Sequence, residues 1–147
     1  MAKQSIVIAA DHAGYRLKSI LADEIVVLGY NVVDLGTDST NSVDYPDFGH
    51  AAALAILNSK AFLGVICCGS GIGIAMAANR HSGIRAAVCH NVTTARLARA
   101  HNNANIIAIG ERIIGCEVAK ECVKTFLLTP FDEGRHIDRI EKIDLAN

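Results

Sequence analysis

The sequence lacks several features that would mark particular classes of protein. Its 147 residues include no tryptophan and only two prolines. The 14 Lys and Arg residues nearly balance the 15 Asp and Glu residues, so no excess charge indicates a nucleic-acid or membrane surface. The apolar run from Ile6 to Ala10 stops at Asp11, which makes it too short for a signal peptide or a membrane span. We therefore expect a cytoplasmic protein that binds neither nucleic acid nor membrane.

Metal-site and disulfide patterns are also missing. The five cysteines contain no CxxC pair, and no Cys/His spacing is typical of a zinc site. In the cytoplasm these cysteines should stay reduced, and most are best interpreted as small buried apolar residues. The sequence thus predicts no metal centre, and no redox cofactor is expected.

About half of the residues are apolar, which suits one domain covering residues 1–147. Short apolar runs alternate with helical patterns, and this alternation predicts a three-layer α/β/α sandwich with a Rossmann-like, five-stranded parallel sheet. The expected strands are residues 5–9, 31–35, 63–67, 84–88 and 106–109. The expected helices are residues 15–28, 47–59 (with Asp47 as cap), about 72–79, 93–100 and 115–128, followed by an amphipathic segment at about 134–145.

Ligands of such folds bind beyond the carboxyl ends of the strands. This rule points to the loops 11–14, 36–46, 68–73 and 89–94. The third of them is Cys68-Gly69-Ser70-Gly71-Ile72-Gly73. It is not a Walker loop, because no Gly-Lys-Ser/Thr follows at the required spacing, and it is not a dinucleotide fingerprint, because position 74 is Ile and not Gly. What remains is a row of backbone N–H groups at a helix start, which suits a phosphate or an oxyanion, or else a tight packing turn.

Cys68 stands at the mouth of this loop. A thiol there either faces the positive end of the helix dipole, which favours the thiolate, or is simply a buried packing residue. Strand side chains alternate, so Cys67 and Cys68 point to opposite faces and only one can face the site.

Three further groups could carry chemistry. Asp11-His12 follows the first strand and can move protons, or can form an Asx turn. His101 lies near a helix end, where a histidine is more often a C-cap group. Arg135 and Arg139 share one helical face, as a phosphate clamp or as a solvated charged face.

Together these pieces resemble the ribose-5-phosphate isomerase B / galactose-6-phosphate isomerase subunit family. The resemblance covers almost the whole chain. It rests on segments in the family's order: 10–14 (ADHAG), 44–47 (DYPD), 68–73 (CGSGIG), 77–79 (AAN), 83–86 (GIRA), 100–102 (AHN), 110–112 (GER), and 134–136 (GRH) with Arg139.

The resemblance implies a role for each matched residue. Asp11 and His101 would open the furanose ring, Cys68 would be the base for a cis-enediolate, and Ser70 with the loop N–H groups would stabilise that enediolate. One family branch uses a glutamate base where this chain has Ile74, which places it in the cysteine branch. The phosphate would be held by His12, Arg112, Arg135 and Arg139, and the sugar hydroxyls would be contacted by Tyr45 and Asn102. Gly69, Gly71 and Gly73 would bind the substrate as part of the Gly-rich loop. His50, His81, His90 and His136 receive no role.

The implied function is conversion of ribose 5-phosphate to ribulose 5-phosphate, in the pentose phosphate pathway. Alternatives are a hexose 6-phosphate isomerase for allose or galactose 6-phosphate, a non-catalytic sugar-phosphate-binding protein, and a cysteine hydrolase. The resemblance also implies a homodimer or a dimer of dimers with shared active sites, in which the final helix packs on a partner subunit.

Overall fold

The computed structural model describes residues 2–144 and contains one five-stranded sheet. Its strands lie in the order β2-β1-β3-β5-β4, and every neighbouring pair is parallel. The predicted fold class is therefore confirmed. The strands are β1 (Ser5–Ala10), β2 (Asn31–Asp34), β3 (Leu63–Cys68), β4 (Ala86–Val88) and β5 (Ile106–Gly110).

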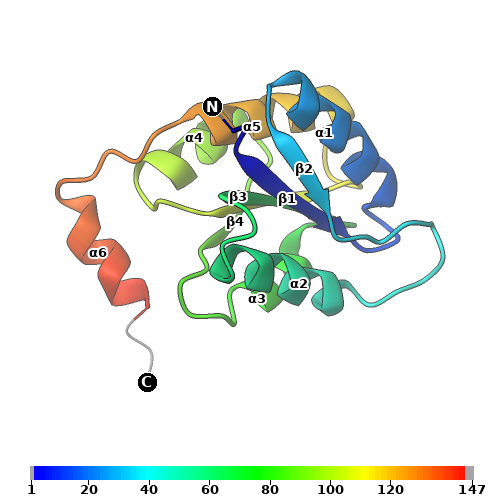
Figure 1. Ribbon diagram of the computed structural model, residues 1–147, viewed down its shortest axis with the longest axis horizontal. Helices are drawn as coiled ribbons and strands as arrows, with labels where there is room; N and C mark the ends of the chain where they lie inside the picture. Colours follow the sequence, from blue (N-terminus) through cyan, green and yellow to red (C-terminus); the bar gives the residue numbers. More distant parts are fainter. Residues whose placement is uncertain (1, 145–147) are drawn as a thin grey trace.

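Helices cover both faces of this sheet and complete the three layers. On one face lie α1, α4 and α5, and on the other lie α2 and α3 (Figure 1). The bounds are α1 (Tyr15–Val27), α2 (Tyr45–Leu57), α3 (Ile72–Ala78), α4 (Val92–Ala100), α5 (Cys116–Leu128) and α6 (His136–Ile143). Within residues 2–144, none of these helices combines the length and hydropathy that a membrane crossing requires.

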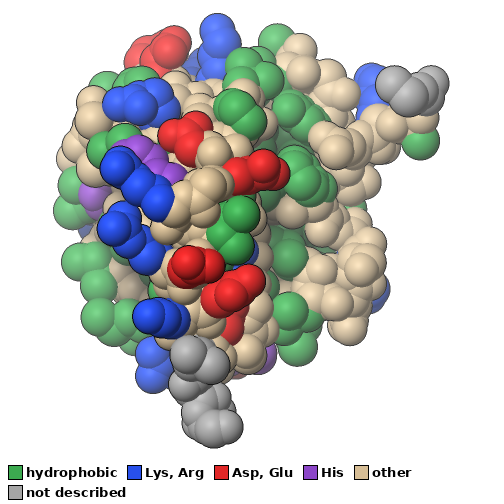
Figure 2. All heavy atoms as spheres, turned by 90° about the vertical axis from the view of Figure 1, so that its left-hand side faces the viewer, with side chains coloured by type: hydrophobic (Ala, Val, Ile, Leu, Met, Phe, Trp, Pro, Cys, Tyr) green, Lys and Arg blue, Asp and Glu red, His purple; other side chains and the backbone are tan. Residues whose placement is uncertain are grey.

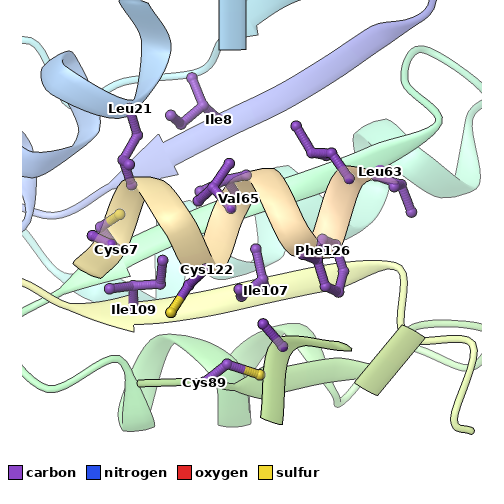
Figure 3. Packing of buried hydrophobic residues seen from close by; sticks show 14 of the residues in the cluster. Ile8, Leu21, Leu63, Val65, Cys67, Cys89, Ile107, Ile109, Cys122 and Phe126 are labelled. Carbon is purple, nitrogen blue, oxygen red and sulfur yellow. The ribbon is translucent and has the colours of Figure 1, made fainter. Parts of the chain in front are cut away.

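Strand alternation divides the core into two parts. Ile6 and Ile8 of β1 pack toward α1 and α5, whereas Val7 packs toward α2 and α3. Figure 3 shows the first part, where Phe126 of α5 lies against the sheet near Leu63 and Ile107. The inner strands β1, β3 and β5 are apolar on both faces because both faces are covered, which explains the continuous apolar runs in the sequence.

The start of α2 differs from the prediction. Asp47 is not its cap, because the helix begins at Tyr45 with Asp44 at the N-cap position and Pro46 in the first turn. Proline suits this turn, since its φ angle is already helical and its missing N–H has no intrahelical partner there. The loop after β2 is correspondingly shorter, and Tyr45 lies on a helix.

The C-terminal segment forms α6. This helix lies apart from the sandwich helices and away from the carboxyl ends of β1 and β2 (Figure 1). Of its predicted apolar stripe, Ile140 is buried, while Ile137 and Ile143 are 40% and 54% exposed. Leu145, the expected end of this segment, lies outside the described residues. Packing of α6 on a partner subunit stays a prediction.

Candidate active site

The carboxyl ends of β1 and β3 form the switch point of the sheet. The chain runs from β1 outward to β2 on one side, while β3 borders β5 on the other. In open α/β sheets this crevice is where ligands bind. The loop after β1 packs directly on β3 here, because a Cβ on Gly14 would lie only 2.6 Å from the carbonyl oxygen of Cys67. Asp11 and the Gly-rich loop are therefore neighbours.

The Gly-rich loop turns sharply around the Cys68 thiol. Gly71 takes a positive φ of 78° at the N-cap of α3, and its N–H donates to Cys68 Sγ at 3.0 Å. The Ser70 hydroxyl accepts an N–H from Ile72 at 3.2 Å. A donor N–H and the amino end of a helix both stabilise negative charge on the sulfur. The thiol is thus held in an environment suited to a base.

Cys67 lies on the opposite face, as strand alternation predicts. It belongs to the core under α1 and α5, whereas Cys68 belongs to the core under α2 and α3. Burial raises the pKa of the Cys67 thiol far above its usual range. Cys67 is therefore a packing residue.

Asp11 is buried at the end of β1 and forms the Asx turn that the sequence left open. Its Oδ1 accepts the N–H groups of Ala13 at 3.0 Å and Gly14 at 3.1 Å. Its Oδ2 has no hydrogen-bond partner among residues 2–144. The turn thus orients the carboxylate and leaves one oxygen for a ligand.

His12 is held by the loop that follows β2. The N–H of Val43 donates to His12 Nδ1 at 3.1 Å, so Nδ1 is the acceptor. In a neutral ring the proton is then on Nε2, which is free to donate to a ligand. This loop contact fixes the tautomer without a charged partner.

Beside His12 lies a cavity of about 270 Å³ lined by two arginines, Arg16 and Arg112. Glu111 also lines it, but its Oε1 accepts the N–H of Leu17 at 2.6 Å and so caps α1. The remaining side chains that line it are those of Ala13 and Thr40. A small cavity with two guanidinium groups suits a phosphate.

Two glycines allow side chains to approach the Gly-rich loop closely. A Cβ on Gly69 would lie 3.3 Å from Arg112 Nη1, and a Cβ on Gly73 would lie 2.6 Å from Tyr45 Cζ. The backbone N–H of Arg112 donates to the carbonyl of Gly69 at 3.1 Å. Arg112 and Tyr45 therefore flank the loop, at the positions that a ligand near Cys68 would contact.

His101 and Asn102 lie at the opposite end of the strands, which is the amino edge of the sheet. They follow α4 and precede β5, whereas Cys68 pairs in register with Gly110 at the far end of β5. From Ile106 to Gly110 the strand advances roughly 13 Å. Within one chain, the structure thus separates His101 from Asp11 and Cys68.

The two predicted clamp arginines, Arg135 and Arg139, lie on the same side as His101 and Asn102, and these four residues are called the second residue group. Arg135 is the N-cap residue of α6 and Arg139 lies one turn further, and both are exposed. The ring of His136 stacks on that of His101, with centroids 4.5 Å apart. Loss of hydration lowers the pKa of His136, and His101, Arg135 and Arg139 add to this effect. Figure 2 shows basic side chains and histidine gathered on the face that carries α6.

The turn that carries His101 and Asn102 is fixed by two other arginines. The Arg85 Nε donates to the Asn102 carbonyl at 3.1 Å, and Arg99 Nη1 donates to the Ala104 carbonyl at 2.6 Å. These hydrogen bonds hold the backbone of the turn in place, at the amino edge of the sheet.

Sequence reasoning missed Arg16 and the cap formed by Glu111. The available signal for Arg16 was its spacing, since it lies four residues after His12 in the first turn of a helix that starts at the site. Among the unassigned histidines, His50 and His81 pair at 2.8 Å, and His90 Nε2 accepts the N–H of Gly110 at 3.0 Å. Burial lowers the pKa of His90, which suits this acceptor role.

Comparisons with known proteins show the family and the fold. A family model described as Ribose/Galactose Isomerase matches residues 6–143. Ribose-5-phosphate isomerase B of Escherichia coli is 39% identical over 140 residues, which are 95% of this chain and 94% of the relative. D-erythrulose-4-phosphate isomerase of Pectobacterium atrosepticum is 41% identical over 140 residues, or 95% and 92%. A crystal structure of a ribose 5-phosphate isomerase from Thermotoga maritima superposes with a TM-score of 0.96 at 48% identity, covering 99% and 100% of the two chains.

Proposed function

This chain belongs to the ribose/galactose isomerase family, and from that premise we propose that it interconverts ribose 5-phosphate and ribulose 5-phosphate. The observation that carries the proposal is the Cys68 thiol, which accepts a backbone N–H at a helix start beside the arginine-lined cavity. A base next to a phosphate pocket is what an aldose–ketose isomerase requires. We place this activity in the cytoplasm, in the pentose phosphate pathway.

The reaction proceeds in two stages. Ring opening moves the proton of the C1 hydroxyl to a base and returns a proton to the ring oxygen, and we assign this stage to Asp11 and His101. Cys68 then removes the C2 proton of the open aldehyde and returns it to C1, while O1 gains a proton and the O2 hydroxyl loses one. Between these transfers, hydrogen bonds from the Ser70 hydroxyl and the N–H groups of the Gly-rich loop stabilise the negative charge of the cis-enediolate.

Substrate binding divides between the phosphate and the sugar hydroxyls. We assign the phosphate to His12 Nε2, Arg112, Arg135 and Arg139. Tyr45, which lies on Gly73, and Asn102 would contact the hydroxyls. Contacts to the phosphate, remote from the reacting carbons, hold those carbons against Cys68.

These assignments require two chains. Cys68 and His12 lie at the carboxyl edge of the sheet, while His101 and the α6 arginines lie at the amino edge. We propose a homodimer, or a dimer of dimers, in which each carboxyl edge receives His101, Asn102, Arg135 and Arg139 of the partner subunit. A two-fold interface builds two identical sites of this kind.

A substrate panel tests the proposed function. Purified protein is given ribose 5-phosphate, erythrose 4-phosphate, allose 6-phosphate or galactose 6-phosphate with EDTA present, and ketose formation is followed. The highest kcat/KM is expected for ribose 5-phosphate, undiminished by the chelator. A higher value for the four-carbon substrate would favour the activity that one relative's name states. No turnover of any of the four would contradict the proposal.

Arg16 provides a first prediction, because it lines the same cavity as His12 and Arg112. Arg16→Gln should raise the KM for ribose 5-phosphate about three- to tenfold and leave kcat nearly unchanged, since the guanidinium is exposed and distant from the reacting carbons. Initial rates at varied substrate concentration measure this. The matched control is Arg96→Gln on the exposed face of α4. Equal KM values for both variants would remove Arg16 from the site.

His101 provides a second prediction. Erythrose 4-phosphate cannot close a furanose ring, because its O4 carries the phosphate. His101→Asn should therefore lower kcat/KM about 100-fold for ribose 5-phosphate and much less for erythrose 4-phosphate. Comparable losses on both substrates would assign His101 to enolisation or to folding instead.

A further inference from the structure

Three potential metal ligands meet at the surface of the second residue group. They come from separate elements: His101 is the C-cap of α4, Asp132 lies in the segment after α5, and His136 begins α6. Their ligand atoms all lie within 4.8 Å of one another. The side chains of His101 and Asp132 are 41% and 56% exposed, so an ion can reach them from solution.

A backbone hydrogen bond and ring stacking bring these three groups together. The Asp132 N–H donates to the Ala100 carbonyl at 2.9 Å, which fixes the carboxylate beside the next residue, His101. The Nε2 of His101 lies 4.0 Å from Asp132 Oδ2. The rings of His101 and His136 are nearly parallel, at 13°. The cluster is therefore preorganised, although it is wider than an occupied site.

We propose that His101, Asp132 and His136 form a binding site for Zn²⁺, and that the bound ion inhibits isomerisation. Two imidazoles and one carboxylate are a common zinc ligand set that leaves a fourth position open. Tetrahedral bonds of about 2.0–2.1 Å place ligand atoms roughly 3.3 Å apart, so side-chain rotations that shorten the separations between ligand atoms by up to about 1.5 Å would close the site. The inhibition rests on the proposed function of His101, whereas the binding site does not.

Nearby charges set the expected strength of binding. Arg135 and Arg139 lie on the same helix as His136 and oppose a divalent cation, whereas the Asp132 carboxylate attracts it. Both arginines are exposed, which weakens their repulsion through solvent. We therefore expect micromolar affinity and inhibition that EDTA reverses. The predicted activity in EDTA is consistent with this, since the ion serves no step of the reaction.

The test measures binding and inhibition separately in the full-length protein. Co²⁺ replaces Zn²⁺ as a spectroscopic probe, because a tetrahedral site absorbs strongly in the visible range and a thiolate ligand adds a charge-transfer band. Zn²⁺ is then titrated into the ribose 5-phosphate assay. The variants are His136→Gln, at a partly buried position, and Asp132→Asn, at an exposed position, and we assign neither residue a catalytic role. The controls are His81→Gln, which breaks the other histidine pair, and Cys116→Ser, which removes the exposed thiol.

The proposal predicts a Co²⁺ spectrum without a thiolate band and Zn²⁺ inhibition in the parent and both control variants. Relative to its own metal-free activity, each of the variants His136→Gln and Asp132→Asn should require at least tenfold more Zn²⁺ for half inhibition. Equal inhibition of all variants, or a thiolate band, would place the ion at a cysteine and overturn the proposal. Absence of Co²⁺ and Zn²⁺ binding would also overturn it. Binding without inhibition would refute its second half.

Discussion

Cys68→Ala is expected to lower kcat for ribose 5-phosphate by about 10³-fold or more, because it removes the group that carries the proton between C2 and C1. The affinity for inorganic phosphate should change little, since the thiol acts on the reacting carbons while phosphate contacts His12 and the arginines. Steady-state kinetics and competition by phosphate measure the two effects. The expected pattern is a loss confined to kcat.

Cys67→Ala is the matched control for this variant. It removes the same thiol from the adjacent residue, but on the face that packs under α1 and α5. A small buried cavity should lower thermal stability slightly, and kcat should stay near the parent value. If Cys68→Ala kept most of its kcat, another group would be the base and the assignment would be wrong.

The double substitution Arg135→Ala/Arg139→Ala should lower kcat/KM by about 10²- to 10⁴-fold. Each guanidinium contributes a charge-assisted contact to the phosphate dianion, of about 1.5–3 kcal/mol. The loss should appear mainly in KM, with a matching loss of phosphate inhibition. Initial-rate kinetics and phosphate competition give both values.

Lys142→Ala supplies the control, since it removes an exposed cation from the last turn of the same helix. Because all three side chains are exposed, melting temperatures should stay close to that of the parent. Unchanged KM in the double variant would leave α6 without a role in phosphate binding.

Most of the fold was predictable because strand and helix signals in this chain are local. The inner strands β1, β3 and β5 are nearly continuous apolar runs, and Gly29, with φ of 99°, follows α1 where a stop was expected. The start of α2 was misplaced since Pro46 can either end a loop or open a helix, and only the backbone around Asp44 decides. Element boundaries depend on such contacts.

The candidate site was predictable only in part. Strand alternation places Cys67 and Cys68 on opposite faces, and the residues after β1 and β3 meet as the carboxyl-edge rule requires. The separation of His101 from Cys68 within one chain follows from chain order, because a turn between a helix and the next parallel strand lies at the amino end of the sheet. The stacking of His101 on His136 was beyond this reasoning, since it depends on how α6 packs and not on any local pattern.

Side-chain partners far apart in sequence were equally inaccessible. The hydrogen bond from Val43 to His12 joins residues 31 positions apart, and the cap that Glu111 provides to Leu17 spans 94. Both depend on how loops from different strands meet at the sheet edge. The family resemblance can identify His12, but only the structure shows that Nδ1 accepts a hydrogen bond and that Nε2 is left to donate.

We propose that each active site joins the carboxyl edge of one chain to the amino edge of another. Subunit mixing tests it directly, using the inactive Cys68→Ala and Arg135→Ala/Arg139→Ala proteins at equal concentration. Random exchange makes half of the dimers mixed, and each mixed dimer has one intact site, so activity should return to about a quarter of the parent value. If mass spectrometry shows that mixed dimers form while activity stays at the level of the separate variants, the arginines serve their own chain and the shared site is refuted.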